Sequence, residues 1–182
     1  MVLKIFAFLI STVYSECNYL PPFSKGQSYR IIQGFNGKYS HSHPLEYGVD
    51  FDMPEGTLIL SSRAGIVRET KEDSKLGGPD KKFLKHANKV IIEHKDGTKA
   101  LYAHLAYKSL RVKKGQKIAH GLPIGRSGCT GWCDGAHLHF EIFREQEKGS
   151  RKSIPFRFKT KSGCTVPKLG SNISNELSKR SH

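Results

Sequence analysis

Two histidines separated by one residue carry the clearest chemical signal in this chain. His137 and His139 lie in the run HLHFEIF, in which polar and apolar residues alternate. Residues two apart project from the same face of a β-strand, so both imidazoles would face one side while Leu138 and Phe140 anchor the other. Two such rings can share one metal centre, one binding the ion and the other reaching its water or the substrate. On their own, they fit a solvated or hydrogen-bonded pair on a sheet surface somewhat better, because imidazole is common outside metal sites.

Other side chains with ligand atoms come from separate segments. His104 lies in LYAHL, on a strand whose face is expected to carry Tyr102 as well. The segment SHSHPLEYGVDF supplies four more candidates: His41, His43, Glu46 and Asp50. Zinc takes histidine nitrogen and carboxylate oxygen, and a catalytic zinc keeps three protein ligands and one open position. A histidine-rich face, an aspartate on a neighbouring strand and no HExxH helix suggest a zinc hydrolase built on β-strands.

The elements that would position these residues are short strands. Strand-like runs alternate with glycine-containing turns, at 47–53, 57–62, 65–70, 89–94, 99–105 and 137–143. An Asp-Gly pair between the fourth and fifth runs predicts a hairpin. No segment shows a long 3.6-residue apolar period. We therefore predict an all-β single domain, with residues 71–88 as a long polar loop of the kind that is often functional.

The N-terminus is typical of an exported protein. MVLK is followed by IFAFLISTVY, which has no charge, and Val13 and Ser15 suit the minus-three and minus-one positions of a signal-peptidase site. The alternative is a buried first helix or strand. The apolar run is shorter than the roughly 20 residues of a membrane span, and no later run is longer. We predict a signal peptide at 1–15, an N-terminal segment at 16–33, the main domain at 34–170 and a frayed polar tail at 171–182.

Four cysteines in an exported chain predict two disulfides. Cys129 and Cys133 are close enough to clip one turn, and Cys17 and Cys164 would then tie the N-terminal to the C-terminal segment. Four cysteines allow three pairings, and the sequence does not choose among them. A Cys/His zinc site is the alternative, but the Cys129-x3-Cys133 spacing lacks a second matching pair.

The composition favours a folded protein that binds polyanions. Hydrophobic residues make up 37% and charged residues 25% of 182 residues, which argues against a disordered chain, a collagen or a long coiled coil. The formal charge of +14 fits nucleic acid, an anionic membrane or an anionic cell wall. An exported nuclease is disfavoured because clustered basic-aromatic motifs and a carboxylate-rich metal site are missing.

Several motifs occur together in a fixed order. They are GVDFDMPEGT, SSRAGIV, NKVIIEHKDGTKALYAHL and VKKGQKIAHGLPIGRSGCTGWCDGAHLHFEI. In this order they resemble the lysostaphin-type (LytM-like) zinc endopeptidases of bacterial cell walls. The resemblance covers residues 34 to about 143, and IPFRF at 154–158 looks like a further family segment. It implies antiparallel sheets that form a groove with one zinc ion at its floor.

The resemblance also implies roles for individual residues. Asp50 and His139 match metal ligands of the family, and His104 and His137 match its two non-ligand catalytic histidines. The common family motif places the first ligand histidine four residues before the aspartate, where this chain has Glu46.

Members with a longer insertion carry a Ser-His pair further upstream. That pattern makes His41, nine residues before Asp50, the expected third ligand. His43 and Glu46 remain the alternatives, since zinc also accepts a carboxylate.

The function implied is that of an exported endopeptidase with one Zn²⁺ per chain. It would hydrolyse peptide bonds in peptidoglycan stem peptides or cross-bridges, in the periplasm or at the cell wall. Peptidoglycan and anionic envelope polymers are the predicted partners, and nucleic acid is not. The alternative is a catalytically inactive relative of the same fold that binds the wall or activates an amidase. Such a relative would be expected to lose ligands, which this chain retains.

Overall fold

The computed structural model describes residues 17–176, so the predicted signal peptide at 1–15 lies outside the described residues. Within this range, strands dominate, and the helical turns are two short 3-10 helices, η1 (Lys81–His86) and η2 (Glu147–Gly149). The all-β prediction is confirmed. None of the helices among residues 17–176 has the length and apolarity needed to cross a membrane.

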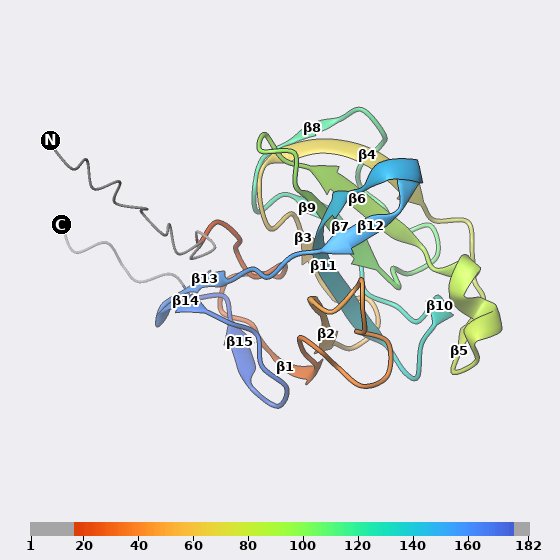
Figure 1. Ribbon diagram of the computed structural model, residues 1–182, viewed down its shortest axis with the longest axis horizontal. Helices are drawn as coiled ribbons and strands as arrows, with labels where there is room; N and C mark the ends of the chain where they lie inside the picture. Colours follow the sequence, from red (N-terminus) through yellow and green to blue (C-terminus); the bar gives the residue numbers. More distant parts are fainter. Residues whose placement is uncertain (1–16, 177–182) are drawn as a thin grey trace, which may run out of the picture.

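One large antiparallel sheet forms the body of the molecule (Figure 1). Its strand order is β15-β1-β2-β11-β7-β6-β4-β8, and β12 pairs with the outer part of β11. The strands are β1 (Ser28–Gln33), β2 (Gly48–Asp52), β4 (Gly65–Lys71), β6 (Lys89–Glu93), β7 (Lys99–Ala103), β8 (Lys117–Ile118), β11 (His137–Glu145), β12 (Arg151–Ser153) and β15 (Asn172–Ser174). The long strand β11 lies between β2 and β7, so it joins segments far apart in the chain.

Three two-stranded sheets surround the large one. They are β3 (Leu58–Leu60) with β9 (Pro123–Arg126), β13 (Phe158–Thr160) with β14 (Gly163–Thr165), and β5 (Gly77–Gly78) with β10 (Gly131–Trp132). The first two pairs are antiparallel and the last is parallel. The expected antiparallel architecture therefore holds, with this one short parallel pair as the exception.

The hydrophobic core lies on one face of β2 and β11. Val49 and Phe51 of β2 and Leu138 and Phe140 of β11 are fully buried in it. Asp50 projects to the opposite face, as the alternation predicts, because successive side chains of a strand point to opposite sides. The core therefore fixes which face of the sheet presents the polar side chains.

The two ends of the described chain pair with each other. β1 pairs antiparallel with β15, and both Ile31 and Ile173 are fully buried. The prediction of a frayed tail from residue 171 is therefore wrong for its described part, because Ile173 contributes to the core. Likewise, the segment 16–33 contains a strand of the large sheet.

Both predicted disulfides are present. Cys17 is bonded to Cys164 and Cys129 to Cys133, with Cα–Cα distances of 5.4 Å and 5.6 Å. Since no cysteine is free, a Cys/His zinc site is excluded.

The predicted loop at 71–88 is anchored rather than loose. The buried amide of Asn88 donates to the carbonyls of Ser74 and Leu105, and its backbone N–H donates to Thr130 Oγ1. Pairing of β5 with β10 ties the loop to the turn closed by Cys129–Cys133. The two segments approach so closely that a Cβ at Gly77 would collide with the Cys129 carbonyl. The loop and the disulfide turn form one wall beside the polar face of β11.

Candidate metal centre and groove

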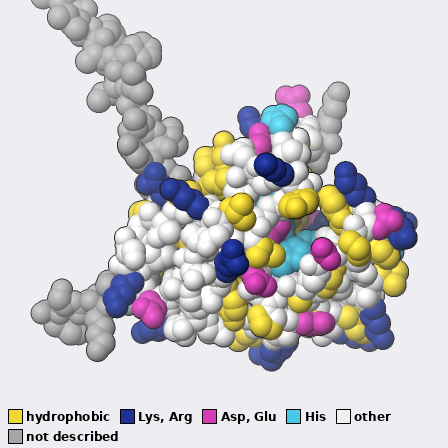
Figure 2. Space-filling view, turned by 90° about the horizontal axis from the view of Figure 1, so that it is seen from below, with side chains coloured by type: hydrophobic (Ala, Val, Ile, Leu, Met, Phe, Trp, Pro, Cys, Tyr) yellow, Lys and Arg dark blue, Asp and Glu magenta, His cyan; other side chains and the backbone are white. Residues whose placement is uncertain are grey.

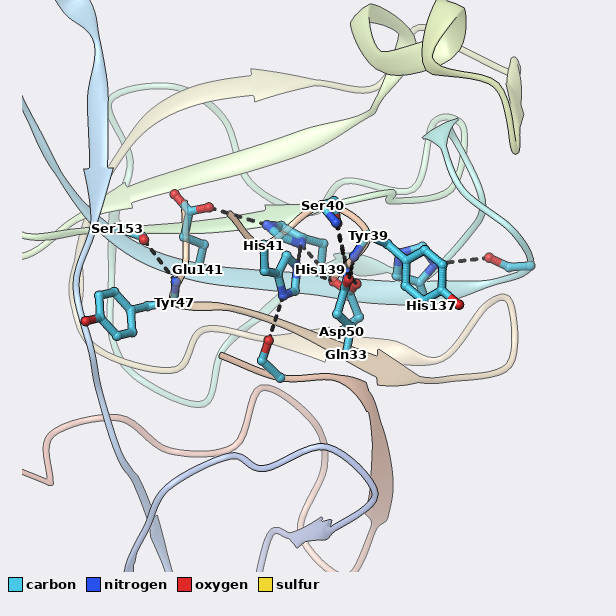
Figure 3. A network of polar contacts seen from close by, with 12 residues as sticks. Gln33, Tyr39, Ser40, His41, Tyr47, Asp50, His137, His139, Glu141 and Ser153 are labelled. Atoms are coloured by element: carbon cyan, nitrogen blue, oxygen red, sulfur yellow. Dashed lines mark hydrogen bonds and ion pairs between the residues drawn. The ribbon is translucent and has the colours of Figure 1, made fainter. Parts of the chain in front are cut away.

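Three side chains converge on the polar face of β2 and β11 (Figure 3). His139 lies opposite Asp50 in the β11–β2 register, and His41 reaches them from the loop before β2. His139 Nδ1 lies 2.8 Å and His41 Nε2 3.3 Å from Asp50 Oδ1, and the two nitrogens lie 3.3 Å apart. Their ligand atoms all lie within 4.8 Å of one another, which a single ion can bridge.

The remaining polar atoms of this trio have partners of their own. His41 Nδ1 donates to the Gly34 carbonyl at 3.0 Å, so its Nε2 is left for a ligand. Asp50 Oδ2 accepts from Gln33 Nε2 at 2.7 Å. Gln33 Oε1 in turn accepts from the backbone N–H of Tyr39 at 3.0 Å, which ties β1 to the loop of His41. Outer partners of this kind orient metal ligands.

The space beside the trio depends on a glycine. A Cβ on Gly48 would lie 2.8 Å from His41 Nε2 and 2.9 Å from His139 Cε1. The donor set of two imidazole nitrogens and one carboxylate oxygen is one that zinc prefers. Donor chemistry and available space therefore both fit a zinc ion.

Neither alternative to His41 reaches the centre. The His43 side chain is 75% exposed, and its Nδ1 pairs with Glu46 Oε1 at 2.8 Å. His41, by contrast, is buried, because the loop folds back with its N–H donating to the Gly37 carbonyl at 3.2 Å. The structure thus brings together His41, Asp50 and His139.

Two further histidines stand next to the trio without joining it. The rings of His104 and His137 are in contact, with centroids 4.4 Å apart and planes inclined by 44°, and the centroid of His104 lies 6.0 Å from that of His139. His104 Nδ1 donates to the Thr130 carbonyl at 2.7 Å, and His137 Nδ1 donates to the Gly135 carbonyl at 3.0 Å. Among the described residues, neither Nε2 has a hydrogen-bond partner, so both can face a substrate.

The backbone conformation at His104, and not the alternation of a strand, places its ring on the polar face of the sheet. The prediction that His104 and Tyr102 share a face is wrong: Tyr102 is fully buried in the core against Phe140. β7 ends at Ala103, and His104 has a φ of +63°, in the left-handed region that non-glycine residues rarely occupy. This turn directs the His104 ring to the polar face of the sheet.

The electrostatics of the trio suit a cation. Burial alone would raise the pKa of Asp50, but hydrogen bonds from His139 and His41 outweigh it and hold that pKa well below its usual value. Burial alone would lower the pKa of His139, but Asp50 and Glu141 raise it to about 9. A metal ion would take the place of the proton that His139 and Asp50 share, so metal binding should release a proton.

His104 differs from this trio. Burial, together with repulsion from His137 and His139, lowers the pKa of His104 to about 3. His104 is therefore neutral near pH 7, with an unprotonated Nε2.

Two hollows that share wall residues adjoin the centre. One, of about 410 Å³, is lined by Tyr39, Asp134 and the catalytic candidate His137. The other, of about 580 Å³, is lined by apolar, basic and acidic side chains including Leu84, Lys85 and Glu141. Both include Ser40, His104, Trp132 and His139 in their walls. Figure 2 shows histidine at the bottom of a depression bordered by hydrophobic and charged side chains.

Sequence reasoning missed two residues of this arrangement. Gln33 ends β1, where nothing in the local sequence separates it from any other polar strand residue. Strand alternation puts Glu141 on the same face of HLHFEIF as the two histidines, but it does not predict the complete burial of this side chain beside His139. Only the fold makes the partners of these two side chains visible.

Comparison with known proteins adds independent findings. The chain is 39% identical over 95 residues to the peptidoglycan DD-endopeptidase ShyA of Vibrio cholerae, covering 52% of this chain and 19% of ShyA. A crystal structure of a zinc-containing peptidase from Vibrio cholerae matches with 32% identity and a TM-score of 0.52, over 70% of this chain and 37% of that one. The antimicrobial peptidase lysostaphin from Staphylococcus simulans matches with 27% identity and a TM-score of 0.52, over 69% and 46% of the two chains. The chain thus spans less than half the length of each of these proteins.

The family assignment follows from a longer match. The model of Peptidase family M23 matches residues 44–151, which is more than half of the chain. The matched range contains Asp50, His104, His137 and His139, whereas His41 lies just before it. The chain therefore belongs to Peptidase family M23.

Proposed function

We propose that the protein is a zinc-dependent endopeptidase that hydrolyses peptide bonds in peptidoglycan stem peptides or cross-bridges. The observation that carries this proposal is the pairing of two groups. A His-Asp-His trio with converging ligand atoms stands beside two buried histidines whose Nε2 atoms are free. The named activity of ShyA, a peptidoglycan DD-endopeptidase, supports the choice of substrate.

His41, Asp50 and His139 would hold one zinc ion per chain. When bound, zinc lowers the pKa of a coordinated water to about 7 and polarises a carbonyl group. The three residues would offer His41 Nε2, Asp50 Oδ1 and His139 Nδ1, since His41 Nδ1 and Asp50 Oδ2 have hydrogen-bond partners and His139 Nε2 faces Glu141. A catalytic zinc site has three protein ligands, so His104 and His137 are left for other tasks.

His104 and His137 would handle the protons. Each donates from Nδ1 to a backbone carbonyl, which leaves Nε2 as the acceptor in the neutral ring. The depressed pKa of His104 keeps it neutral, so its Nε2 can accept a hydrogen bond from the attacking water. Once one ring has taken the proton, it can donate to the developing oxyanion and then to the leaving amine. A positioned base contributes typically about 10²–10⁴-fold to the rate.

The shape of the groove supports an endopeptidase. The two hollows share four wall residues, of which His139 belongs to the trio, so a peptide would have room on both sides of the bond that is cut. An enzyme that removes a terminal residue needs room on only one side. Trp132 lies in the walls of both hollows and is positioned to contact the peptide across the cleavage site.

The cysteines and the charge support the proposed compartment. Two disulfides and no free thiol support a location outside the cytoplasm, in the periplasm or at the cell wall. The formal charge of +14 supports attraction to anionic envelope polymers. An inactive wall-binding relative would have no use for free Nε2 atoms on His104 and His137.

Muropeptide digestion tests the proposal. Purified protein is incubated with peptidoglycan, and the products are identified by mass spectrometry with and without a chelator. We expect new peptide termini that the chelator abolishes. His104→Ala and His137→Ala should keep zinc but lose about 10²–10⁴-fold in rate. His120→Ala, at an exposed histidine, is the matched control. Undiminished hydrolysis in chelator, or a parent protein that holds zinc but cuts no wall preparation, contradicts the proposal.

A further inference from the structure

A fully buried carboxylate, that of Glu141, lies beside the metal centre. Glu141 follows His139 by two residues on β11, so both side chains project from the same face of the sheet. Its residue exposure is 0%, which is rare for glutamate unless it is paired. Nothing in the proposed reaction so far uses this side chain.

The surroundings of Glu141 are cationic but offer no ordinary hydrogen bond. Oε2 lies 3.6 Å from His139 Nε2, which is an ion-pair distance, and Oε1 lies 3.2 Å from Arg151 Nε of β12. Neither oxygen has a hydrogen-bond partner among the described residues. Burying a carboxylate in this way is costly, and only well-placed positive charge offsets it. Arg151 supplies a permanent charge, and the His139 ring supplies the other partner.

The position of Glu141 bears on the tautomer of His139. Nδ1 of His139 faces Asp50 and must be unprotonated to bind a cation, so Nε2 must then carry the proton. In Figure 3, Glu141 points to His139 from the side of the ring away from Asp50. Which nitrogen of a ligand histidine is free is set by the partner of the other nitrogen. For His139, the acceptor that faces Nε2 is the Glu141 carboxylate.

The sheet leaves room for this contact. In the β11–β2 register, Glu141 lies opposite Gly48, which has no side chain to separate it from His139 and His41. On the other side it lies opposite Leu101 of β7, whose side chain belongs to the small buried cluster on that face. The carboxylate is thus buried on the polar face of the sheet, in the wall of the 580 Å³ hollow, with Arg151 beside it.

We propose that Glu141 is a positioning residue of the metal centre, whose carboxylate holds His139 in the tautomer that presents Nδ1 to zinc and so raises zinc affinity. Arg151 keeps the carboxylate in place. The inference rests on the proposed role of His139 as a zinc ligand, and it adds a residue that does not touch the ion.

Glu141→Gln is the informative variant because it keeps the shape of the side chain. Because the cationic Arg151 lies 3.2 Å from Oε1, the amide oxygen of the variant should take that position and leave the amide NH₂ facing His139 Nε2. That nitrogen must then accept, which moves the ring proton to Nδ1, the atom that would bind zinc. Outer-partner substitutions typically weaken metal binding about 10- to 100-fold. The matched control is Glu145→Gln on the same strand, where the glutamate is exposed and pairs with Lys99.

Zinc dissociation constants are measured by chelator competition for the parent and both variants, with thermal unfolding of the metal-free forms. We expect Glu141→Gln to bind zinc about 10- to 100-fold more weakly and Glu145→Gln to match the parent. If the folded Glu141→Gln variant binds zinc as tightly as the parent, the inference is overturned. A parent that binds no zinc contradicts the proposed function instead, so the two failures are distinguishable.

A measurement on the parent protein tests the inference even if the Glu141→Gln variant does not fold. The ¹⁵N shifts of the His139 ring in the zinc-loaded protein report which nitrogen carries the proton. We expect a protonated Nε2 whose proton exchanges slowly with water. A rapidly exchanging Nε2 proton, or a ring protonated at Nδ1, overturns the inference.

Discussion

Replacing Gly48 with alanine should damage the metal centre without disturbing the backbone. Gly48 begins β2, and its φ is not in the left-handed region, so alanine fits the backbone there. The new Cβ would lie 2.8 Å from His41 Nε2, whereas ordinary van der Waals contact begins at 3.4 Å. His41 would have to retreat by about 0.6 Å, which is three times the roughly 0.2 Å tolerance of metal–ligand distances.

The size of the effect follows from the cost of overpacking. Adding a methyl group to a tightly packed interior costs about 1–3 kcal/mol. Because the crowded atoms belong to the ligand rings themselves, this strain opposes the geometry that holds zinc. At about 1.4 kcal/mol per factor of ten, zinc affinity should fall roughly 5- to 140-fold.

Chelator competition measures this change, and wall-peptide hydrolysis at limiting zinc should fall in parallel. The matched control is Gly125→Ala in β9, where the new Cβ would lie 3.1 Å from the flexible end of Leu110, away from the centre. That variant should keep the parent's zinc affinity. If Gly48→Ala also binds zinc with the parent's affinity, the ligand atoms do not occupy the space described, and the reasoning fails.

Three further outcomes are expected. Zinc content measured by elemental analysis should be lost in His41→Ala and retained in His43→Ala, because only His41 joins the trio; zinc retained in both would reject His41 as a ligand. Opening the disulfide with Cys133→Ser should lower kcat while zinc is kept, because the clipped turn carries the Thr130 carbonyl that orients His104; an unchanged kcat would show that the turn holds its shape alone. Burial lowers the pKa of His94, and the hydrogen bond to the Ala64 carbonyl offsets only part of this lowering. The imidazole therefore binds a proton less readily in the folded state than in the unfolded chain. Stability should therefore fall as pH drops below about 6.5. In urea titrations with excess chelator, His94→Asn should lose less stability than the parent between pH 7.5 and 5, and equal losses would contradict this account.

Period-two alternation accounts for what the sequence predicted well. It placed Asp50 and His139 on polar strand faces because Val49, Phe51, Leu138 and Phe140 must all enter one core. It could not supply the register that sets His139 opposite Asp50, since these residues are 89 positions apart and pair only in the folded sheet.

Local backbone geometry accounts for the misses. His104 reaches the centre through a left-handed φ that strand alternation does not represent. β15 is only three residues long, and Ile173 is its one buried apolar side chain. Without knowledge of its pairing with β1, its sequence is typical of a polar tail. The choice of His41 over His43 depended on how the loop before β2 folds, and two histidines so close together differ little in sequence terms.

The Cys17–Cys164 bond turns most of the described chain into a covalent ring. Its sulfur atoms join residues 147 positions apart, and closing such a loop stabilises the native state by about 5 kcal/mol in the chain-entropy model. A single proteolytic cut at the exposed residues of η1 would therefore leave both fragments attached to each other. Such a nicked molecule would keep all three ligand segments on one covalent body, and only reduction would separate them on a gel. One backbone break inside the ring therefore leaves the molecule covalently joined.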